Sequence, residues 1–375
     1  MRKLPMALVG ALAAGSFALS GSGLATATPA PAKATITGQV SQTGQPLRIL
    51  AKRSNLIVGT AVNSDALADD AEYRGLVAKQ FNGVTPENVM KWEVIEPERG
   101  VYDFSQADAL VKFAQQNHQS IHGHTLVWHS QLPKWLTDGY ADGSITNADV
   151  KQIMKDHITT VVKHFKGKID SWDVVNEMIT DGDNPQLRDT IFLSAIGPGY
   201  IADALRWAHK ADPKPKLYLN DYATDNINPK STAYYDLAKK LLKEKAPLGG
   251  IGFQGHLDLQ YPLPIDAPAN LARFDKLGLE TAFSEVDVRF DLPVDNWKTA
   301  GQVGSFNTLL QACLLTRHCA RFTLWGFTDK YSWVPGFFEG QGSATPLDEN
   351  FAPKPAWYGL QQVLSLAGAG GRRTT

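Results

Sequence analysis

The sequence predicts a (β/α)8 TIM barrel, an α/β fold in which eight parallel strands alternate with helices around one core. Short, apolar, β-branched segments alternate with longer helix-like segments over roughly 320 residues. Polar and aromatic side chains also recur where these segments end. A doubly wound open sheet is the alternative, but it usually has a glycine-rich phosphate turn after its first strand. Val58-Gly59-Thr60-Ala61 is not such a turn.

The expected strands are apolar runs bounded by turn-forming residues. They cover residues 56–62, 83–89, 120–128, 169–177, 216–221, 250–257, 280–288 and 321–328. The expected helices cover residues 66–81, 104–117, 147–165, 200–210, 231–245, 270–277, 302–315 and 354–366. In one of them, Leu237, Leu241 and Leu242 repeat at helical spacing and define a buried face.

The N-terminus has the composition of a targeting segment. Met1-Arg2-Lys3 precedes an apolar stretch that ends at Ala25-Thr26-Ala27, a small-residue cleavage site. A membrane anchor is the alternative, but Gly and Ser interrupt the stretch and no stop-transfer flank follows. We expect a signal peptide over residues 1–27, a spacer over 28–46, one barrel domain over 47–367 and a flexible tail over 368–375. The protein would then be secreted, with no membrane segment in its mature form.

The bulk composition is that of a globular protein. Of 375 residues, 43% are hydrophobic and 20% are charged, and the formal net charge of -1 gives no indication of nucleic-acid binding. We expect a monomer. The two cysteines, Cys313 and Cys319, lie in one short stretch. Export favours a disulfide between them, two buried thiols are the alternative, and ligands for zinc at suitable spacing are missing.

Polar and aromatic residues follow the second to the eighth expected strand. They are Glu87, Asn88, Lys91 and Trp92; His124, Trp128, His129 and Gln131; Asn176 and Glu177; Asn220, Asp221 and Tyr222; Gln254 and His256; Glu285 and Asp287; and Trp325, Asp329 and Trp333. The carboxyl ends of barrel strands meet on one face, where active sites lie. Because buried polar groups need partners, we expect these side chains to form one polar cleft.

Two glutamates in this set point to a reaction. Glu177 and Glu285 each follow a short apolar run, one on the fourth strand and one on the seventh. A single glutamate at a strand end is usually a solvated loop residue or a helix cap. Two carboxylates at one end of a barrel can cut a glycosidic bond, because one protonates the leaving oxygen while the other attacks the sugar or holds a water.

Five motifs resemble those of glycoside hydrolase family 10, the retaining endo-β-1,4-xylanases, of the secreted bacterial type, both in their residues and in their order along the chain. The motifs are Thr85-Pro86-Glu87-Asn88-Val89-Met90-Lys91-Trp92, Gly123-His124-Thr125-Leu126-Val127-Trp128-His129, Trp172-Asp173-Val174-Val175-Asn176-Glu177, Gly252-Phe253-Gln254-Gly255-His256-Leu257 and Trp325-Gly326-Phe327-Thr328-Asp329. The resemblance covers about residues 47–366.

The resemblance implies a role for each matching residue. Glu177 would be the acid/base and Glu285 the nucleophile, with His256 on the nucleophile and Asp287 supporting His256. Asn176 would bind the sugar 2-hydroxyl. The remaining substrate-binding residues would be Glu87, Asn88 and Lys91 for the distal sugar, His124, Trp128 and Gln131 around the cleaved sugar, Trp325 and Trp333 as walls, Tyr222 on the leaving-group side, and Gln254.

Three alternatives stay open at the level of the sequence. Some enzymes with this barrel remove sugars from plant glycosides such as the saponin tomatine instead of cutting xylan. A barrel without turnover that only binds carbohydrate is a second alternative, although such a barrel would be expected to have lost one of the two glutamates. His122, His124 and His129 suggest a metal site as a third. We expect no metal and no cofactor, and xylan as the polysaccharide partner.

Overall fold

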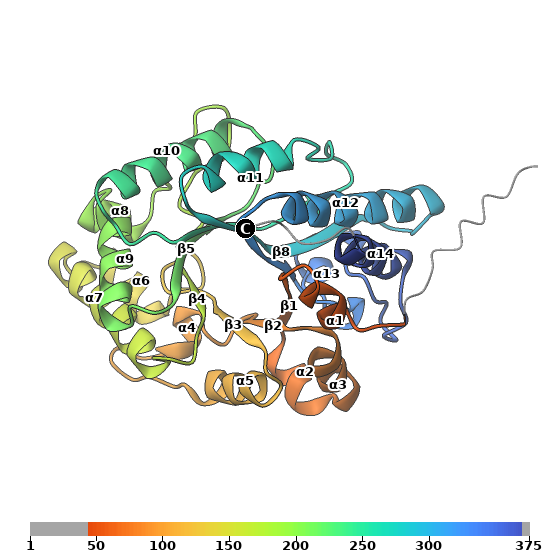
Figure 1. The fold of residues 1–375 in the computed structure, drawn as a ribbon. Helices are drawn as coiled ribbons and strands as arrows, with labels where there is room; N and C mark the ends of the chain where they lie inside the picture. Colours follow the sequence, from red (N-terminus) through yellow and green to blue (C-terminus); the bar gives the residue numbers. More distant parts are fainter. Residues whose placement is uncertain (1–43, 370–375) are drawn as a thin grey trace, which may run out of the picture. The chain divides into compact units, whose positions relative to one another are not determined.

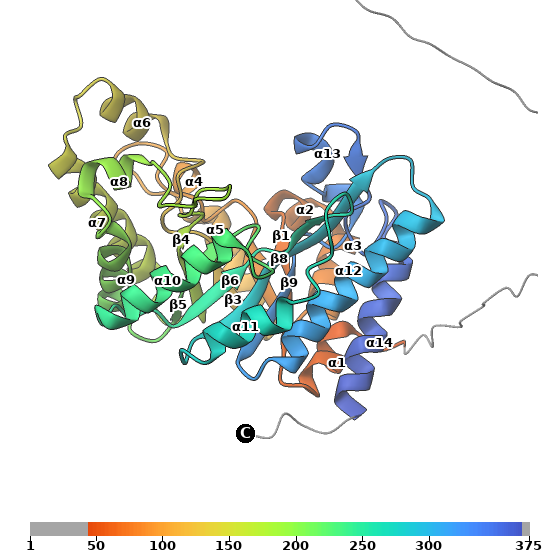
Figure 2. The same cartoon turned by 90° about the horizontal axis from the view of Figure 1, so that it is seen from above.

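The structure is a computed structural model and describes residues 44–369. Within this part, parallel strands close into a barrel that helices surround (Figures 1 and 2). The (β/α)8 TIM barrel predicted from the sequence is confirmed. The expected signal peptide, all but the last residues of the expected spacer and most of the expected tail lie outside the described residues.

The barrel strands are β1 (Ile57–Val62), β2 (Gly83–Pro86), β3 (Ser120–Gly123), β4 (Ser171–Asn176), β5 (Lys216–Asp221), β6 (Gly250–Phe253), β8 (Glu280–Asp291) and β9 (Cys319–Leu324). Neighbours pair in parallel in this order, and β9 pairs with β1 to close the barrel. Two short strands extend β8 beyond the barrel: β7 (His256–Asp258) pairs with it in parallel and β10 (Gln341–Gly342) antiparallel.

The helices are α1 (Leu47–Lys52), α2 (Ser64–Asp69), α3 (Ala71–Gln80), α4 (Trp92–Ile95), α5 (Ser105–Gln116), α6 (Lys134–Ala141), α7 (Asn147–His164), α8 (Ile191–Ile196), α9 (Tyr200–Ala211), α10 (Pro229–Lys243), α11 (Ala267–Asp275), α12 (Asn296–Leu315), the 3-10 turn η1 (Asp329–Tyr331), α13 (Val334–Phe337) and α14 (Pro355–Ala369). The first and last of them pack side by side, at the end of the barrel away from α13 (Figure 2). There, Gln361 Nε2 donates to the carbonyl of Gln45 over 3.0 Å. No helix in the described residues is long and apolar enough to span a membrane.

Two expected elements are each divided in the structure. The helix expected over 66–81 is α2 and α3, because Asp70 is extended and its carboxylate caps α3 by accepting from the N–H groups of Glu72 and Tyr73. The strand expected over 250–257 is β6 and β7, because Gly255 takes a φ of +77° between them. The strand expected over 120–128 ends at Gly123, although Leu126 and Val127 still donate to β4.

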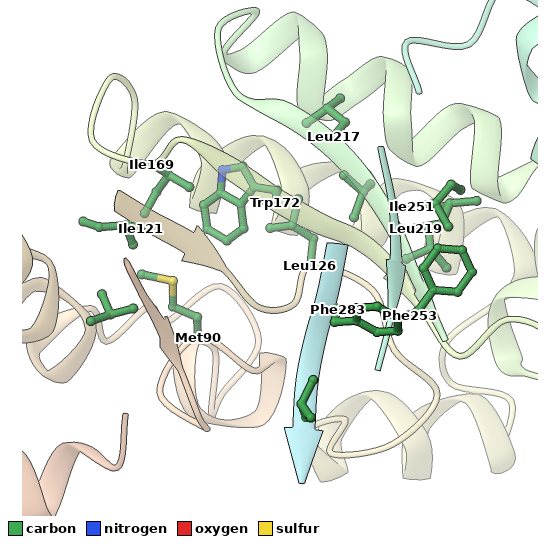
Figure 3. Packing of buried hydrophobic residues seen from close by; sticks show 14 of the residues in the cluster. Met90, Ile121, Leu126, Ile169, Trp172, Leu217, Leu219, Ile251, Phe253 and Phe283 are labelled. Carbon is green, nitrogen blue, oxygen red and sulfur yellow. The ribbon is translucent and has the colours of Figure 1, made fainter. Parts of the chain in front are cut away.

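Apolar side chains of the barrel strands pack outward against the helices. Figure 3 shows Phe253 and Phe283 on the neighbouring strands β6 and β8, with ring centroids 6.2 Å apart. Phe253 also contacts Phe274 of α11 at 5.3 Å and Tyr234 of α10 at 6.4 Å. Because side chains alternate along a strand, the neighbours of Phe253 on β6 point the other way, into the barrel.

Those inward positions on β6 are glycines. A Cβ on Gly250 would lie 2.4 Å from the ring of Tyr218, and one on Gly252 would lie 2.2 Å from Oδ1 of Asn220. Tyr218 and Asn220 belong to β5, which pairs with β6. The two glycines therefore leave the space in which these side chains of β5 reach across the interior.

The disulfide expected between Cys313 and Cys319 is confirmed. It joins the last turn of α12 to the first residue of β9. Both residues are buried, so the bridge ties the turn between the two elements from within the fold.

Filling the space beside Asn220 should destabilise the barrel. For Gly252→Ala we expect a loss of about 1–3 kcal/mol in the free energy of unfolding, since the added methyl group overpacks a fully enclosed side chain. Denaturant unfolding of the purified protein measures it. Gly75→Ala is the control: Gly75 lies inside α3 with nothing within 4 Å of its Cβ, so this variant should gain about 0.5–1 kcal/mol. Equal stability of Gly252→Ala and the wild type would contradict the packing described.

Candidate active site

A cavity of about 1250 Å3 opens at the carboxyl ends of the barrel strands. The sequence-predicted site residues that line it are Glu87, Asn88, Lys91, His124, Trp128, Gln131, Asn176, Glu177, Tyr222, Gln254, His256, Glu285, Trp325 and Trp333. Asp287 lies behind this wall and is buried. The structure therefore brings these residues together, from strands that are far apart in the sequence. Three other residues expected in the cleft do not line the cavity: Trp92 donates to Glu96, Asp221 pairs with Lys230, and Asp329 pairs with Lys354.

Glu285 lies on β8 and is enclosed by donors. Its Oε1 accepts from Asn220 Nδ2 over 2.6 Å, and its Oε2 lies 3.1 Å from His256 Nε2. Burial alone would raise the pKa of this carboxyl, but His256 and His124 outweigh it and hold the pKa below its usual range. The side chain is therefore kept as an anion in a site almost closed to water.

His256 is the cation that faces Glu285. Its other ring nitrogen, Nδ1, makes a close ion-pair contact of 3.0 Å with Asp287 Oδ2, which also accepts from Trp333 Nε1 over 2.8 Å. Burial disfavours the charged imidazolium, but Asp287 and Glu285 together raise the pKa of His256 to about 10. The imidazolium is thus fixed between two carboxylates.

Glu177 follows β4 and faces the same cavity. Its Oε2 accepts from Trp128 Nε1 over 2.9 Å, and its Oε1 accepts from Gln254 Nε2 over 3.2 Å. Its backbone has a φ of +55°, which is uncommon for a residue with a side chain. The N–H of Glu177 donates to the carbonyl of Asn220, and its carbonyl accepts from Arg188 Nε, so both neighbouring peptide groups are held.

Amide side chains connect the two glutamates. Asn220 Nδ2 donates to Glu285 and, over 2.9 Å, to Asn176 Oδ1. Gln254 Nε2 donates to Glu177 and lies 3.5 Å from the same Asn176 oxygen. Because the carbonyl oxygen of Asn176 is used in this way, its NH2 group remains available to a hydroxyl in the cavity, which Asn176 also lines.

Polar groups gather at the β2 side of the cavity. Lys91 Nζ donates to Asn88 Oδ1 over 2.8 Å and to Gln131 Oε1 over 2.7 Å, and lies 5.0 Å from the ring centroid of Trp128. Burial lowers the pKa of Lys91, against the effect of Glu285, Glu87 and other nearby carboxylates. Burial raises the pKa of Glu87. This wall offers several donors and acceptors within a short distance.

Tyr222 lies on the opposite side, after β5. Its hydroxyl donates to Asp181 Oδ2 over 2.5 Å and accepts from Arg188 Nη2 over 2.8 Å, while Lys230 Nζ lies 3.4 Å from its ring centroid. Lys230 also pairs with Asp221, whose pKa burial raises to about 7 in spite of the lysine. Tyr222 is thus fixed in orientation by groups on the loop between β4 and α8 and in the first turn of α10.

Trp325 and Trp333 form the aromatic side of the cavity. Trp325 packs edge-on against His124, with ring centroids 5.2 Å apart, and Trp333 lies 5.1 Å from the ring of His256. These indoles line the side of the cavity where Glu285 lies, and a less polar surrounding strengthens each electrostatic contact there.

The three histidines considered as a metal site do not converge. His122 Nε2 and His124 Nδ1 each lie 2.9 Å from Asp173 Oδ2, whereas His129 Nε2 lies 4.0 Å from Glu177. Of the described residues, His124, Asp173 and Glu285 bring potential ligand atoms within 4.8 Å of one another. All three are buried and engaged with protein groups, so we interpret them as a protein hydrogen-bond network.

Sequence reasoning missed two important contacts. Asn220 was noted at the end of its strand but not assigned to the site, and Asp173 was noted only as part of a motif. Asn220 lies near the end of β5, just before Asp221, and the strand-end pattern included it in the expected cleft but gave it no role. For Asp173 the signal was weaker, since a carboxylate inside a buried strand must have partners, but the sequence does not identify them.

The fold and the site define a class of protein. A TIM barrel whose strand ends bring two glutamates into one polar and aromatic cleft has the equipment of a glycoside hydrolase. The model of glycosyl hydrolase family 10 matches residues 46–363. The chain belongs to glycosyl hydrolase family 10 and is a glycoside hydrolase.

Relatives with a known name agree with this family. Endo-1,4-beta-xylanase B of Thermotoga neapolitana is 40% identical over 335 residues, which cover 88% of this chain and 95% of the relative. Endo-1,4-beta-xylanase of Agaricus bisporus is 41% identical over 304 residues, covering 80% and 89%. The crystal structure of native xylanase 10B from Thermotoga maritima superposes with a TM-score of 0.83 at 41% identity, covering 87% of this chain and 100% of that one. Since bacterial and fungal proteins both match, the expected bacterial type is not singled out.

The raised pKa of His256 makes a stability prediction. A histidine whose pKa is raised by folding stabilises the protein fully below the pKa of the unfolded state, about 6.5, and loses that contribution as the pH rises through about 10. The difference in the free energy of unfolding between the wild type and His256→Asn should therefore be largest below pH 6.5 and should shrink towards pH 10. Denaturant titrations across this range measure it. His209→Asn, an exposed site on α9, is the control, and a difference for His256→Asn that does not change with pH would contradict the assignment.

Proposed function

We propose that this chain is a secreted, retaining endo-β-1,4-xylanase that cuts internal linkages of xylan. The observation that supports it most is the pair Glu177 and Glu285, which face one cavity and are joined through Asn176, Asn220 and Gln254. The relatives named above are xylanases, and this chain matches them over most of their length. Neither the saponin glycosidase nor the non-catalytic barrel receives comparable support.

In the proposed reaction, the ionised Glu285 attacks the anomeric carbon from one face of the sugar. Glu177 gives its proton to the glycosidic oxygen, which leaves with the rest of the chain. Water then enters, Glu177 takes one of its protons, and the resulting hydroxide attacks the same carbon and releases Glu285. For this double displacement the two carboxyl groups should lie roughly 5–5.5 Å apart, whereas an inverting enzyme needs roughly 6.5–9.5 Å.

The cleft residues are assigned to the parts of the substrate on either side of the bond that is cut. We assign the polar group of Glu87, Asn88 and Lys91 to the sugar beyond the cleaved one, because a cluster of donors and acceptors suits hydroxyl groups better than an apolar aglycone. The NH2 group of Asn176 would donate to the 2-hydroxyl, a bond that strengthens in the transition state. Tyr222, on the far side, would face the leaving group.

Trp325 gives a reason for xylose over glucose. It lies 5.2 Å from the ring of His124 and lines the cavity beside Glu285. By the family resemblance it would lie close to C5 of the cleaved sugar, where xylose carries only hydrogens and glucose carries a hydroxymethyl group. Crowding of that kind typically costs about 1–3 kcal/mol, or about ten- to a hundredfold in rate.

Product analysis tests the function directly. From xylan we expect oligosaccharides of several lengths in the first minutes, and proton NMR should show the β-anomer as the first product. An aryl xylobioside should have a kcat/KM about ten- to a hundredfold above that of the matched cellobioside. An initial α-anomer would exclude retention, while a preference for the cellobioside, or for a saponin over xylan, would refute the substrate assignment.

Two substitutions test the two roles. Glu177→Ala should lower the rate on xylan by about 10²–10⁴-fold, the usual contribution of a general acid, but should affect much less an aryl glycoside whose leaving group needs no proton. Glu285→Ala should abolish hydrolysis of both, since no nucleophile is left. Glu98→Ala, an exposed position away from the cavity, is the control and should match the wild type. If Glu177→Ala lost the same factor in rate on both substrates, the assignment of Glu177 as the acid would be contradicted.

A further inference from the structure

A second carboxylate lies buried beside the nucleophile. Asp173 on β4 is 1% exposed, and one polar atom each of His124, Asp173 and Glu285 lies within 4.8 Å of the others. Two carboxylates at this distance repel each other, so the charge of Asp173 raises the pKa of Glu285. The proposed reaction needs an ionised Glu285, so the charge of Asp173 has to be compensated inside the barrel.

Two histidines of one strand provide this compensation. His122 and His124 are two residues apart on and just after β3, and therefore lie on the same face of the chain. His122 Nε2 makes an ion-pair contact of 2.9 Å with Asp173 Oδ2, and His124 Nδ1 bonds the same oxygen over 2.9 Å. Together they outweigh the effect of burial and hold the pKa of Asp173 well below its usual range.

The two histidines differ in their relation to Glu285. His124 Nδ1 lies 2.9 Å from Asp173 and 4.0 Å from Glu285 Oε1, so both carboxylates share this nitrogen. His122 contacts only Asp173 of the two, and its Nδ1 lies 2.6 Å from Ser171 Oγ. It is 1% exposed, does not line the cavity and has no part in the proposed reaction.

We propose that His122 is a positioning residue for the nucleophile: its contact holds Asp173 in place and balances its charge, so that His124 can serve Glu285 as well. This inference depends on the proposed role of Glu285. Without the imidazole of His122, His124 would be the only side chain of residues 44–369 with a hydrogen bond or ion-pair contact to the Asp173 carboxylate. The N–H of His124, which already bonds Asp173, would then be held more tightly by it, and the less balanced charge of Asp173 would act on Glu285. Both changes favour protonation of Glu285.

Other charged and titratable groups around this pair make their close polar contacts with other residues, although the charge of Arg321 also reaches Asp173. On β5, Tyr218 packs edge-on against His122 at 5.5 Å and donates to Glu280 of β8, which also pairs with Lys216. On β9, Arg321 donates to Ser120, and its charge acts on Tyr218, Asp170, Asp173 and Glu280. His256, on β7, is held between Glu285 and Asp287. Of the basic side chains in the described residues, His122 and His124 have a nitrogen within 4 Å of the Asp173 carboxylate.

The experiment is the pH profile of kcat/KM for an aryl β-xylobioside whose leaving group needs no proton, because its acid limb then reports the nucleophile of the free enzyme. We expect the acid limb of His122→Phe to lie about 1 pH unit above that of the wild type. His122→Gln keeps a polar N–H and should fall between the two, and His122→Ala replaces the Phe variant if the latter does not fold. If Asp173 is first replaced by Asn, adding His122→Phe should not move the acid limb beyond its position in the Asp173→Asn variant.

His157 provides a matched control. It is as buried as His122, its Nδ1 lies 3.0 Å from Glu96, and it stacks on Trp92 at 3.8 Å, but it does not line the cavity. His157→Phe should lower the melting temperature and leave the acid limb in place.

Three results would overturn the inference. They are coincident acid limbs for the wild type and the Phe or Ala variant, a limb of His122→Gln displaced further than that of His122→Phe, and a further shift in the Asp173→Asn background. A wild type that does not cleave the xylobioside would instead refute the proposed function. The two failures are therefore distinguishable.

Discussion

The site depends on keeping a carboxylate ionised where water hardly reaches it. Glu285 is 5% exposed, and an isolated charge in such a place would simply take up a proton. The chain prevents this with Asn220, His256 and His124, and each of these needs support in turn. Asp287 and Trp333 fix His256, and Asp173 fixes His124. The polar interior of the barrel is therefore one connected arrangement around Glu285.

Glycines on β6 leave the space inside the barrel that this arrangement needs. Gly250 and Gly252 leave the space that Tyr218 and Asn220 of the neighbouring strand fill, while Phe253 of the same strand packs outward against helices α10 and α11. Apolar packing and polar chemistry thus occupy opposite faces of the same short strands. Stability comes mainly from the outer face, and the inner face is free to carry costly charged groups.

Much of this arrangement could be predicted from the sequence. Alternating strand and helix periods gave the barrel, and the strand-end positions gave Glu177, Glu285 and the residues around them. The break between α2 and α3 at Asp70 and the break between β6 and β7 at Gly255 could not be predicted from the sequence. The first depends on a local helix cap and the second on one backbone angle. The contacts of Asn220 with Glu285 and of His122 with Asp173 were also out of reach. They depend on the register between strands that lie far apart in the sequence, about which local patterns carry no information.

The pairing of α1 with α14 has a practical consequence. Both helices lie at the end of the barrel away from α13, whereas Phe337 of α13 borders the cavity (Figure 2). The described domain therefore starts and finishes at neighbouring points on the face opposite its cleft. A linker, an affinity handle or a solid support attached at either of these points leaves the entrance for a long polymer unobstructed, and the enzyme can be immobilised there without hiding its cleft.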